Sequence, residues 1–546
     1  MPIGSWQRSV VALMTTDVLE AAPAVPAEEV AGTSEVSLTW RASLNLVQSI
    51  LDYSAKLGVG LIVIPILVSS LGRSVFGIWE MLGRLMGYLE STDGRPTQAL
   101  RLMISNLQSH PDHSAKRRWI GSALAVWACF LPLWVATGAL LIWLAPTITK
   151  VGPPLHATVR IVCAVMMLGV LLGGLASLPE SVLRGMNLGY KRMGLQAGIS
   201  VLGGVLLVGA VYLGLGLIGV AAAGVMVVGF TGLCFLVLAR RQVPWFGMER
   251  PSRTQVGTLL QMSLWIAAGD AVAKLLLASD VIVLGMILSP ATVTTYVLTG
   301  YAALLSVNLH SLAADSMIPG LAGIIGDRNY GRAALLRREL LALTVLFLAA
   351  VGSSVLLWNR AFVHLWVGAE NYAGLWTNFL LVLIAAQTAF IRCDSYIIDA
   401  ALQTGSRVRV STIAAVVAVT LSVVLTRYFG TVGLCVGILT GRAIQTVWYP
   451  RLVRGCLSGA AGLSPGWLVR PLFTTTLLFG FSAYAGQYVR VSSWVVWASA
   501  VVLTFAIAGG ITIQLGLPRE IRATARARVA ELARRSGLLQ PGRFRP

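Results

Sequence analysis

The sequence predicts an all-α protein that crosses a membrane about fourteen times, and three observations lead to this prediction. First, 56% of the 546 residues are apolar and only 12% are charged, whereas soluble proteins carry roughly 25% charged residues. Second, apolar stretches recur from residue 44 to residue 516, and many reach the ~20 residues that cross ~30 Å of hydrocarbon. Third, basic residues gather in the short polar segments between these stretches. A single soluble core cannot hold this much apolar sequence, because such cores stop growing beyond roughly 250–300 residues.

The predicted spans form two sets of six and a final pair. The first six lie near residues 44–70, 75–95, 119–145, 157–179, 193–214 and 216–239. The next six lie near residues 257–288, 293–318, 338–358, 374–398, 410–427 and 431–450, and the final pair near 471–489 and 493–516. We therefore expect a disordered N-terminal tail (1–43), an N-lobe (44–240), a linker (241–256), a C-lobe (257–455), a final helix pair (456–516) and a basic tail (517–546).

The charges of the loops predict the orientation. Loops after even-numbered spans carry clustered basic residues, namely Lys116-Arg117-Arg118, Lys191-Arg192, Arg240-Arg241, Arg337-Arg338, Arg407 with Arg409, and Arg451 with Arg454. Loops after odd-numbered spans carry at most one, such as Arg360, Arg427 or Arg490. Because basic loops stay in the cytoplasm, we expect both termini there. No signal peptide is expected over residues 1–40. The dominance of Arg over Lys is typical of a GC-rich bacterial genome, and we expect the protein in a bacterial inner membrane.

Several function classes find no support in the sequence. The six cysteines are scattered singly without metal-binding spacing, and the phosphate-binding pattern GxxxxGK[ST] is absent. The net charge of +20 would suggest nucleic-acid binding in a soluble protein, but here it resides in loops and in the Arg-rich tail, which we expect on the anionic leaflet or docked to a cytoplasmic partner. We expect no enzyme activity, no cofactor, no metal and no nucleic-acid partner.

An internal repeat relates the two halves. Asp52 precedes Lys56 by four residues in the first span, and Asp270 precedes Lys274 by four residues in the seventh. Each pair continues into an apolar run, a short turn and a further span. Six-span halves of this kind are the usual plan of secondary transporters, which bind substrate between the halves near the membrane midplane.

A set of short motifs resembles the MOP superfamily, in particular polysaccharide flippases of the Wzx type that serve O-antigen and exopolysaccharide synthesis. The motifs are Pro65-Ile66-Leu67-Val68-Ser69-Ser70-Leu71-Gly72, Phe76-Gly77-Ile78-Trp79, Gly87-Tyr88, Asp93-Gly94, Val182-Leu183-Arg184-Gly185, Leu365-Trp366-Val367-Gly368 and Ala401-Leu402-Gln403-Thr404-Gly405. The resemblance implies two six-helix lobes around a central cavity that the first, second, seventh and eighth spans line. It also implies transport of lipid II, polyprenyl-diphosphate-linked oligosaccharides or cationic drugs, driven by ion gradients or membrane potential.

Charged residues at membrane depth are the candidate site, because each costs about 2.5–3.5 kcal/mol there and usually faces the protein interior. The cations that would bind a diphosphate headgroup are Arg84, Lys274, Lys56, Arg392 and Arg442, of which Arg84 and Lys274 lie nearest the middle of their spans. Candidates for H⁺ or Na⁺ coupling are Asp280, Asp270 and Asp52, with His310 as a further titratable group. The expected substrate is a lipid-linked glycan, with a polysaccharide polymerase as a possible protein partner.

Three alternatives stay open at this point. The pairs Asp52–Lys56, Glu80–Arg84 and Asp270–Lys274 are spaced i,i+4 and could be structural ion pairs. The same fold could serve a MATE-type cation or drug antiporter. A membrane-embedded glycosyltransferase or polymerase is disfavoured, because every predicted outer loop is short. The tryptophans near span ends are expected to act as interfacial anchors, namely Trp119, Trp143, Trp366, Trp376 and Trp494.

Overall fold

The computed structural model describes residues 31–108, 110–189, 194–315, 318–459, 465–517 and 522. Within these residues every regular element is a helix, which confirms the predicted all-α membrane fold. The predicted N-terminal tail up to residue 30 and the basic tail from residue 518, apart from Arg522, lie outside the described residues. Residues 31–43 of that tail form the start of a long helix.

The helices follow the predicted spans closely. The first half contains α2 (Ala31–Leu71), α3 (Arg73–Ser91), α4 (Pro96–Asn106), α5 (His113–Ile148), α6 (His156–Gly185), α7 (Leu195–Tyr212) and α8 (Gly216–Gln242). The second half contains α9 (Arg253–Ile287), α10 (Pro290–Asp315), α11 (Ile318–Gly326), α12 (Tyr330–Val367), α13 (Leu375–Ala400), α14 (Thr404–Cys456), α15 (Pro465–Ala485) and α16 (Trp494–Ile511). Short turns η1 (Pro153–Leu155), η3 (Ala369–Asn371) and η4 (Thr512–Gly516) complete the described part.

Membrane crossing is supported by the length and composition of these helices. Ten helical segments among the described residues are long and apolar enough to span a bilayer. The protein is therefore a multi-pass membrane protein. Helix occupies each of the fourteen predicted positions, but α3, α10 and α15 are not among the ten, so the count of fourteen crossings stays a prediction.

The two helices of α14 meet at a sharp turn. Gly430 has φ 57° and ψ −137°, which breaks the helix between the spans predicted near 410–427 and 431–450. A residue with a side chain is disfavoured at this positive φ. The two limbs then fold back on each other, since the Ser422 hydroxyl donates to the Leu434 carbonyl at 3.3 Å and Ser411 contacts the Tyr449 hydroxyl at 2.7 Å.

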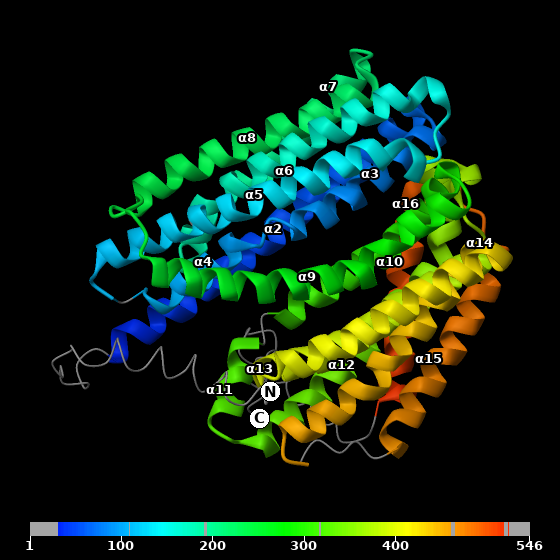
Figure 1. Cartoon of the computed structure of the whole chain (residues 1–546). Helices are drawn as coiled ribbons and strands as arrows, with labels where there is room; N and C mark the ends of the chain where they lie inside the picture. Colours follow the sequence, from blue (N-terminus) through cyan, green and yellow to red (C-terminus); the bar gives the residue numbers. More distant parts are fainter. Residues whose placement is uncertain are drawn as a thin grey trace, which may run out of the picture.

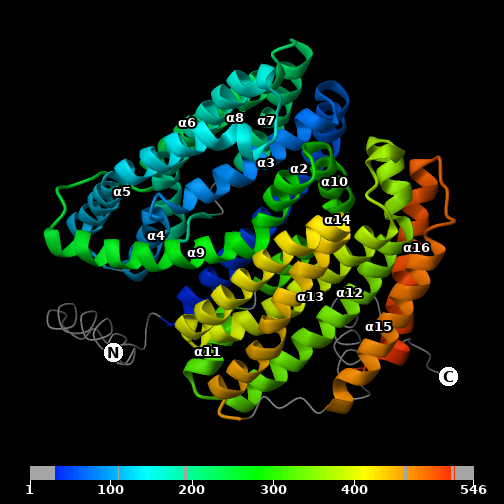
Figure 2. The ribbon, with the colours of Figure 1, turned by 45° about the vertical axis from the view of Figure 1, so that its right-hand side comes forward.

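The helices form two groups, with α9 between them. In Figure 1 the blue, cyan and blue-green helices α2–α8 lie side by side as one group, and α12–α15 form a second group. Turning the molecule keeps the two groups apart, with α9 running along the first group and reaching the second (Figure 2). The final helices α15 and α16 pack against α12.

Helix α9 belongs to two hydrophobic cores. Leu259 near its start packs with Leu100 and Val126 of the first group. Leu284 near its end packs with Leu434 and Cys435 of α14. Between Ser263 and Val281 no described side chain of α9 is fully buried. The middle of α9 therefore crosses from one core to the other with little apolar packing of its own.

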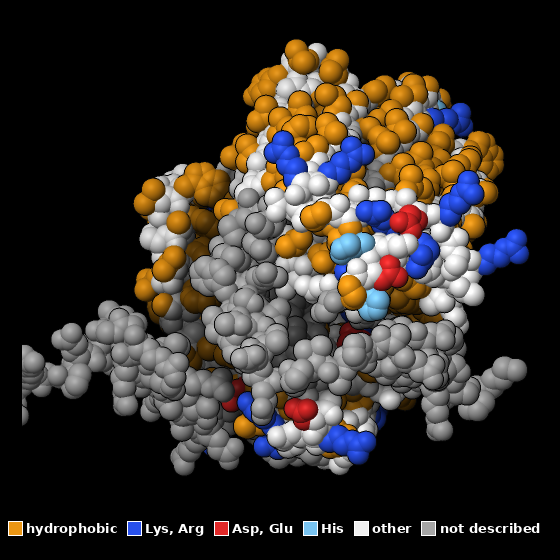
Figure 3. All heavy atoms as spheres, turned by 90° about the vertical axis from the view of Figure 1, so that its left-hand side faces the viewer, with side chains coloured by type: hydrophobic (Ala, Val, Ile, Leu, Met, Phe, Trp, Pro, Cys, Tyr) orange, Lys and Arg blue, Asp and Glu red, His pale blue; other side chains and the backbone are white. Residues whose placement is uncertain are grey.

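The connection between α8 and α9 is folded rather than extended. Val243 and Trp245 are buried in the core of the first group. The Arg117 guanidinium donates to the Trp245 carbonyl at 2.9 Å and lies 3.5 Å from Glu249. Figure 3 views the end of the molecule at which α5 begins, where charged and His side chains gather beside a largely hydrophobic surface. This end fits the polar face that the loop charges predict for the cytoplasm.

Candidate transport site

The site is built where α3 packs antiparallel to α9. Just beyond the end of α9, Gly77 of α3 lies against the carbonyl of Pro290, the first residue of α10, where even a Cβ atom would clash. Further along, Met81 of α3 packs against Gly285 of α9. At the other end the Ser91 hydroxyl donates to the Asp270 carboxylate at 2.6 Å. This close packing brings the polar residues at the end of α3 beside the middle of α9.

Four charged side chains meet there and are called the α3–α9 cluster: Glu90, Arg95, Asp270 and Lys274. Arg95 forms an ion pair with Asp270 at 2.7 Å, and Lys274 lies 3.3 Å from Asp270 and 3.2 Å from Glu90. Lys274 also donates to the carbonyl of Gly87. The Lys274, Arg95 and Asp270 side chains are only 17%, 18% and 25% exposed. The two cations and two carboxylates balance one another, so the cluster ties α9 to α3.

The chain turn after α3 explains how Arg95 reaches Asp270. Gly94 and Arg95 both have positive φ, 75° and 51°, and the Arg95 amide donates to the Asp93 carboxylate at 2.8 Å. A Cβ atom on Gly94 would run into the ring of Phe130. Pro96 then starts α4, a position at which its missing N–H leaves no bond unmade. The motif Asp93-Gly94-Arg95-Pro96 thus reverses the chain and turns the Arg95 side chain toward α9.

A second polar group lies further along α9 and is called the Asp280 group. The Tyr296 hydroxyl of α10 donates to the Asp280 carboxylate at 3.0 Å. Arg442 of α14 is only 5% exposed and donates to the Thr388 hydroxyl and to the Leu276 carbonyl, each at 2.6 Å. Arg442 and Asp280 interact electrostatically, but no ion pair within 4 Å joins Arg442 to a described carboxylate.

Arg84 and Arg392 also stand without an ion pair among the described residues. Arg84 is half-buried on α3, and both it and Asp280 interact electrostatically with Glu80. The expected Glu80–Arg84 contact does not come within ion-pair distance. Arg392 on α13 is half-buried and donates to the Ser311 hydroxyl of α10. Three of the five predicted cations, Arg84, Arg392 and Arg442, are thus buried or half-buried without an ion pair among the described residues.

The first helix contributes less to this arrangement. Asp52 is buried and accepts a hydrogen bond from Gln48 at 3.1 Å. Lys56 is exposed, and no ion pair joins it to Asp52. Of the three i,i+4 pairs expected from the sequence, Asp270–Lys274 is the one that forms. The structure therefore brings Asp270 and Lys274 together with α3 and leaves Asp52 and Lys56 apart on α2.

His310 and Asp394, two other residues at membrane depth, hold neighbouring helices together. His310 is 7% exposed and shares a 2.9 Å hydrogen bond with the Thr344 hydroxyl of α12. Asp394 accepts two hydrogen bonds from the guanidinium of Arg337, at 2.8 and 3.0 Å. The side chains of Arg337 and Asp394 are only 3% and 7% exposed, so this pair fixes α12 to α13 within the second group.

Sequence reasoning missed Glu90, Arg95 and Tyr296 as members of the site. Arg95 is the last residue of the span expected near 75–95, a position at which a basic residue is ordinarily interpreted as a loop charge. The signal that could have identified it is the Asp-Gly-Arg-Pro turn, because two consecutive residues of positive φ reverse the chain toward its neighbour. Tyr296 carries no charge, and only its 3.0 Å contact marks it.

Comparison with known proteins supports the fold. No family model matches the sequence, and the comparison with curated proteins gives no match. Among solved structures, the lipid II flippase MurJ in an inward closed conformation matches with a TM-score of 0.65 at 12% identity, covering 86% of this chain and 99% of that one. An inward-facing multidrug resistance MATE family transporter of the MOP superfamily matches with a TM-score of 0.57 at 13% identity, covering 76% and 99%. A MATE protein in complex with MaD3S matches with a TM-score of 0.55 at 14% identity, covering 77% and 96%.

The fold and the buried polar groups define a class of protein. The chain is a multi-pass helical membrane protein with the fold of MATE and MurJ transporters. Its α3 and α9 carry charged groups that lie close to one another, and α10 adds the Tyr296 hydroxyl beside Asp280. The comparisons therefore show a fold that this chain shares with these solved transporter structures.

Proposed function

We propose that the protein is a secondary transporter that flips a polyprenyl-diphosphate-linked oligosaccharide from the cytoplasmic to the outer leaflet. In this proposal it resides in a bacterial inner membrane with both termini in the cytoplasm, and it supplies a polysaccharide polymerase. Alternating access between the two helix groups would move the headgroup past Arg84, Lys274, Arg392 and Arg442.

The observation that carries this proposal is the set of unpaired internal cations. Arg84, Arg392 and Arg442 form no ion pair with any described carboxylate. A cation at membrane depth costs several kcal/mol unless something compensates it, and guanidinium groups bind phosphate oxygens with two parallel hydrogen bonds. A diphosphate headgroup would supply the missing negative charge during its passage.

The extent of the structural match also supports a flippase. The MurJ structure covers 86% of this chain with a TM-score of 0.65, whereas the two MATE structures cover 76% and 77% with TM-scores of 0.57 and 0.55. Beyond the two sets of six predicted spans, this chain has the helices α15 and α16, which pack on α12. A match over more of the chain favours the lipid-carrying neighbour as a guide to the substrate.

The middle of α9 is suited to move during transport. Its ends are held in separate hydrophobic cores, and its central turns are held by the α3–α9 cluster instead. An arriving diphosphate would compete with Asp270 and Glu90 for Arg95 and Lys274, which would release α9 from α3. Asp280 is the carboxylate we assign to H⁺ or Na⁺ coupling, since it faces Tyr296 and Arg442 on neighbouring helices.

A MATE-type cation antiporter is the second candidate, and one observation favours it. Asp280 forms no ion pair among the described residues, so its carboxylate could receive an organic cation or a coupling ion. The two functions predict opposite selectivity. A flippase needs the internal cations for an anionic cargo, and an antiporter needs Asp280 for a cationic one.

Mass spectrometry of lipids from a deletion strain tests the proposal. Polyprenyl-diphosphate oligosaccharides should accumulate while surface polysaccharide is lost, and the intact gene should restore both. The sensitivity of the deletion strain to cationic drugs should stay unchanged. Normal carrier lipids and surface glycan, in a strain with no second flippase, together with new sensitivity to cationic drugs, would establish the antiporter instead.

A further inference from the structure

A cavity lies outside the transport site, at the opposite end of the long helices from the α8–α9 connection. It has a volume of about 670 Å³ and is formed by the end of α12, the η3 turn, the start of α13 and the connection between α15 and α16. It shares no lining residue with the α3–α9 cluster or the Asp280 group. The charges of the loops predict that this end faces outward.

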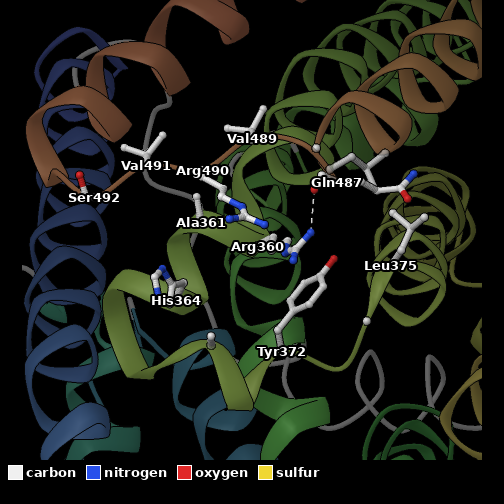
Figure 4. A pocket seen from close by; sticks show the side chains of 14 residues that line it. Arg360, Ala361, His364, Tyr372, Leu375, Gln487, Val489, Arg490, Val491 and Ser492 are labelled. Atoms are coloured by element: carbon white, nitrogen blue, oxygen red, sulfur yellow. Dashed lines mark hydrogen bonds between the residues drawn. The ribbon is translucent and has the colours of Figure 1, made fainter.

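Three side chains of basic character line the cavity: Arg360, His364 and Arg490. Figure 4 shows the guanidinium groups of Arg360 and Arg490 and the hydroxyl of Tyr372 reaching into the same space. Among the residues that the structure describes, no Asp or Glu lines it, and Glu370 of the neighbouring η3 turn lines a different cavity. Arg360 donates one hydrogen bond, to the Gln487 carbonyl at 2.7 Å. None of the three basic residues forms an ion pair within the described part of the chain.

Two guanidinium groups in one cavity repel each other, and an anion between them removes that repulsion. Arg side chains have the geometry to hold phosphate oxygens in pairs of hydrogen bonds. Burial raises the pKa of Tyr372 to about 12. A tyrosine hydroxyl is protonated at neutral pH even at its ordinary pKa of about 10, so Tyr372 can supply a third donor.

The rest of the cavity and its surroundings point to a lipid. The apolar side chains of Leu375 and Val489 line the same cavity as the basic side chains. Large aromatic side chains close in sequence to the cavity are exposed, Trp376 by 68%, Tyr488 by 68% and Trp494 by 46%. Exposed Trp and Tyr at helix ends mark the level of the lipid headgroups. A lipid whose phosphate group lies at this level extends its hydrocarbon chain into the apolar interior of the bilayer.

We propose that this cavity binds the phosphate group of an anionic lipid, with Arg360 and Arg490 on the phosphate oxygens and the apolar lining residues against the adjoining chain. This lipid site is separate from the proposed transport site. The proposal does not depend on whether the transport site carries a glycan lipid. Bound there, a lipid would join the α15–α16 connection to the end of α12.

Photo-crosslinking of the full-length protein in phosphatidylcholine nanodiscs tests the site. The probe is a farnesyl diphosphate analogue with a photoreactive group, and the labelled peptides are mapped by mass spectrometry. We expect labelling within residues 356–375 and 486–492, reduced more than about tenfold by Arg360→Gln with Arg490→Gln. Labelling of α3 and α9 peptides in the same experiment reports binding at the transport site. Each proposal can therefore be contradicted without the other.

The matched control is Arg427→Gln, another exposed Arg at a predicted outer helix end that does not line the cavity. It should leave the labelling unchanged, and Arg360→Lys with Arg490→Lys should retain more labelling than the Gln variant because the charge is kept. If the double Gln variant does not purify as a stable protein, Arg490→Gln alone replaces it, since Arg490 donates no hydrogen bond to a described residue.

Competition identifies the ligand. Unlabelled farnesyl diphosphate should block the labelling, whereas farnesol and inorganic diphosphate at the same concentration should not. Equal competition by farnesol, or full labelling of the double Gln variant, would overturn the phosphate site. Blocking by inorganic diphosphate alone would overturn the lipid as the ligand and assign the cavity to a soluble anion.

Discussion

Arg95 and Asp270 lie 175 residues apart in the chain and form an ion pair of 2.7 Å that joins the end of α3 to the middle of α9. Both side chains are largely shielded, at 18% and 25% exposed. The central turns of α9 bury no described side chain fully. The position of these turns therefore depends on this pair and its neighbours rather than on apolar packing.

Breaking the pair should loosen the middle of α9. Arg95→Gln or Asp270→Asn should speed amide exchange over residues 264–280 by about tenfold or more, because charged hydrogen bonds contribute roughly 1.5–3 kcal/mol. Hydrogen-exchange mass spectrometry of the protein in nanodiscs measures this. The exchanged pair Arg95→Asp with Asp270→Arg should recover part of the protection. Unchanged exchange in both single variants would show that apolar packing holds α9 after all.

Removing two predicted ligands should stop transport without removing the protein. Arg84→Ala with Lys274→Ala should abolish glycan export while membrane abundance stays normal, because a diphosphate then crosses without its counter-charges. Immunoblotting of membranes and assay of surface polysaccharide measure the two effects. Arg427→Ala, at an exposed helix end, is the control and should export normally. Normal export by a well-expressed double variant would disprove the assignment of these residues.

Much of the fold could be predicted from the sequence. Each predicted span is helical, and even the break at Gly430 falls between the spans expected near 410–427 and 431–450. Apolar length and loop charge determine these features locally, so no knowledge of tertiary contacts is needed. The short helices α4 and α11 were not predicted, since neither is long enough to give a membrane-span signal.

The site was harder to predict because its contacts cross between helices. The spacing i,i+4 puts two side chains on one helix face, but it does not say whether they meet. Asp270 and Lys274 meet because Arg95 and Glu90 complete the cluster, whereas Lys56 is exposed and forms no ion pair with Asp52. Arg337 was interpreted as a loop charge, and its burial against Asp394 depends on the packing of α12 on α13.

The buried pair Arg337–Asp394 should matter for stability. Asp394→Ala leaves the guanidinium of Arg337 buried without its carboxylate, which should cost about 3–5 kcal/mol. The variant should therefore unfold at a clearly lower temperature in detergent than the original protein. Replacing both residues, Arg337→Met with Asp394→Leu, should be less destabilising because no lone charge remains. Equal destabilisation by the single and double variants would contradict this account of the pair.

Arg442 offers a test that separates a transport role from a structural one. It is 5% exposed and its hydrogen-bond partners are neutral, the Thr388 hydroxyl and the Leu276 carbonyl. A buried cation without an ion-pair partner carries a desolvation penalty of several kcal/mol, and an apolar side chain does not carry this penalty. Arg442→Leu should therefore unfold at an equal or higher temperature while it loses glycan export. Arg442→Lys keeps the charge and should retain part of the export. If Arg442→Leu instead lowers the unfolding temperature and export falls only in proportion to abundance, Arg442 holds α14 against α9 and does not serve the cargo.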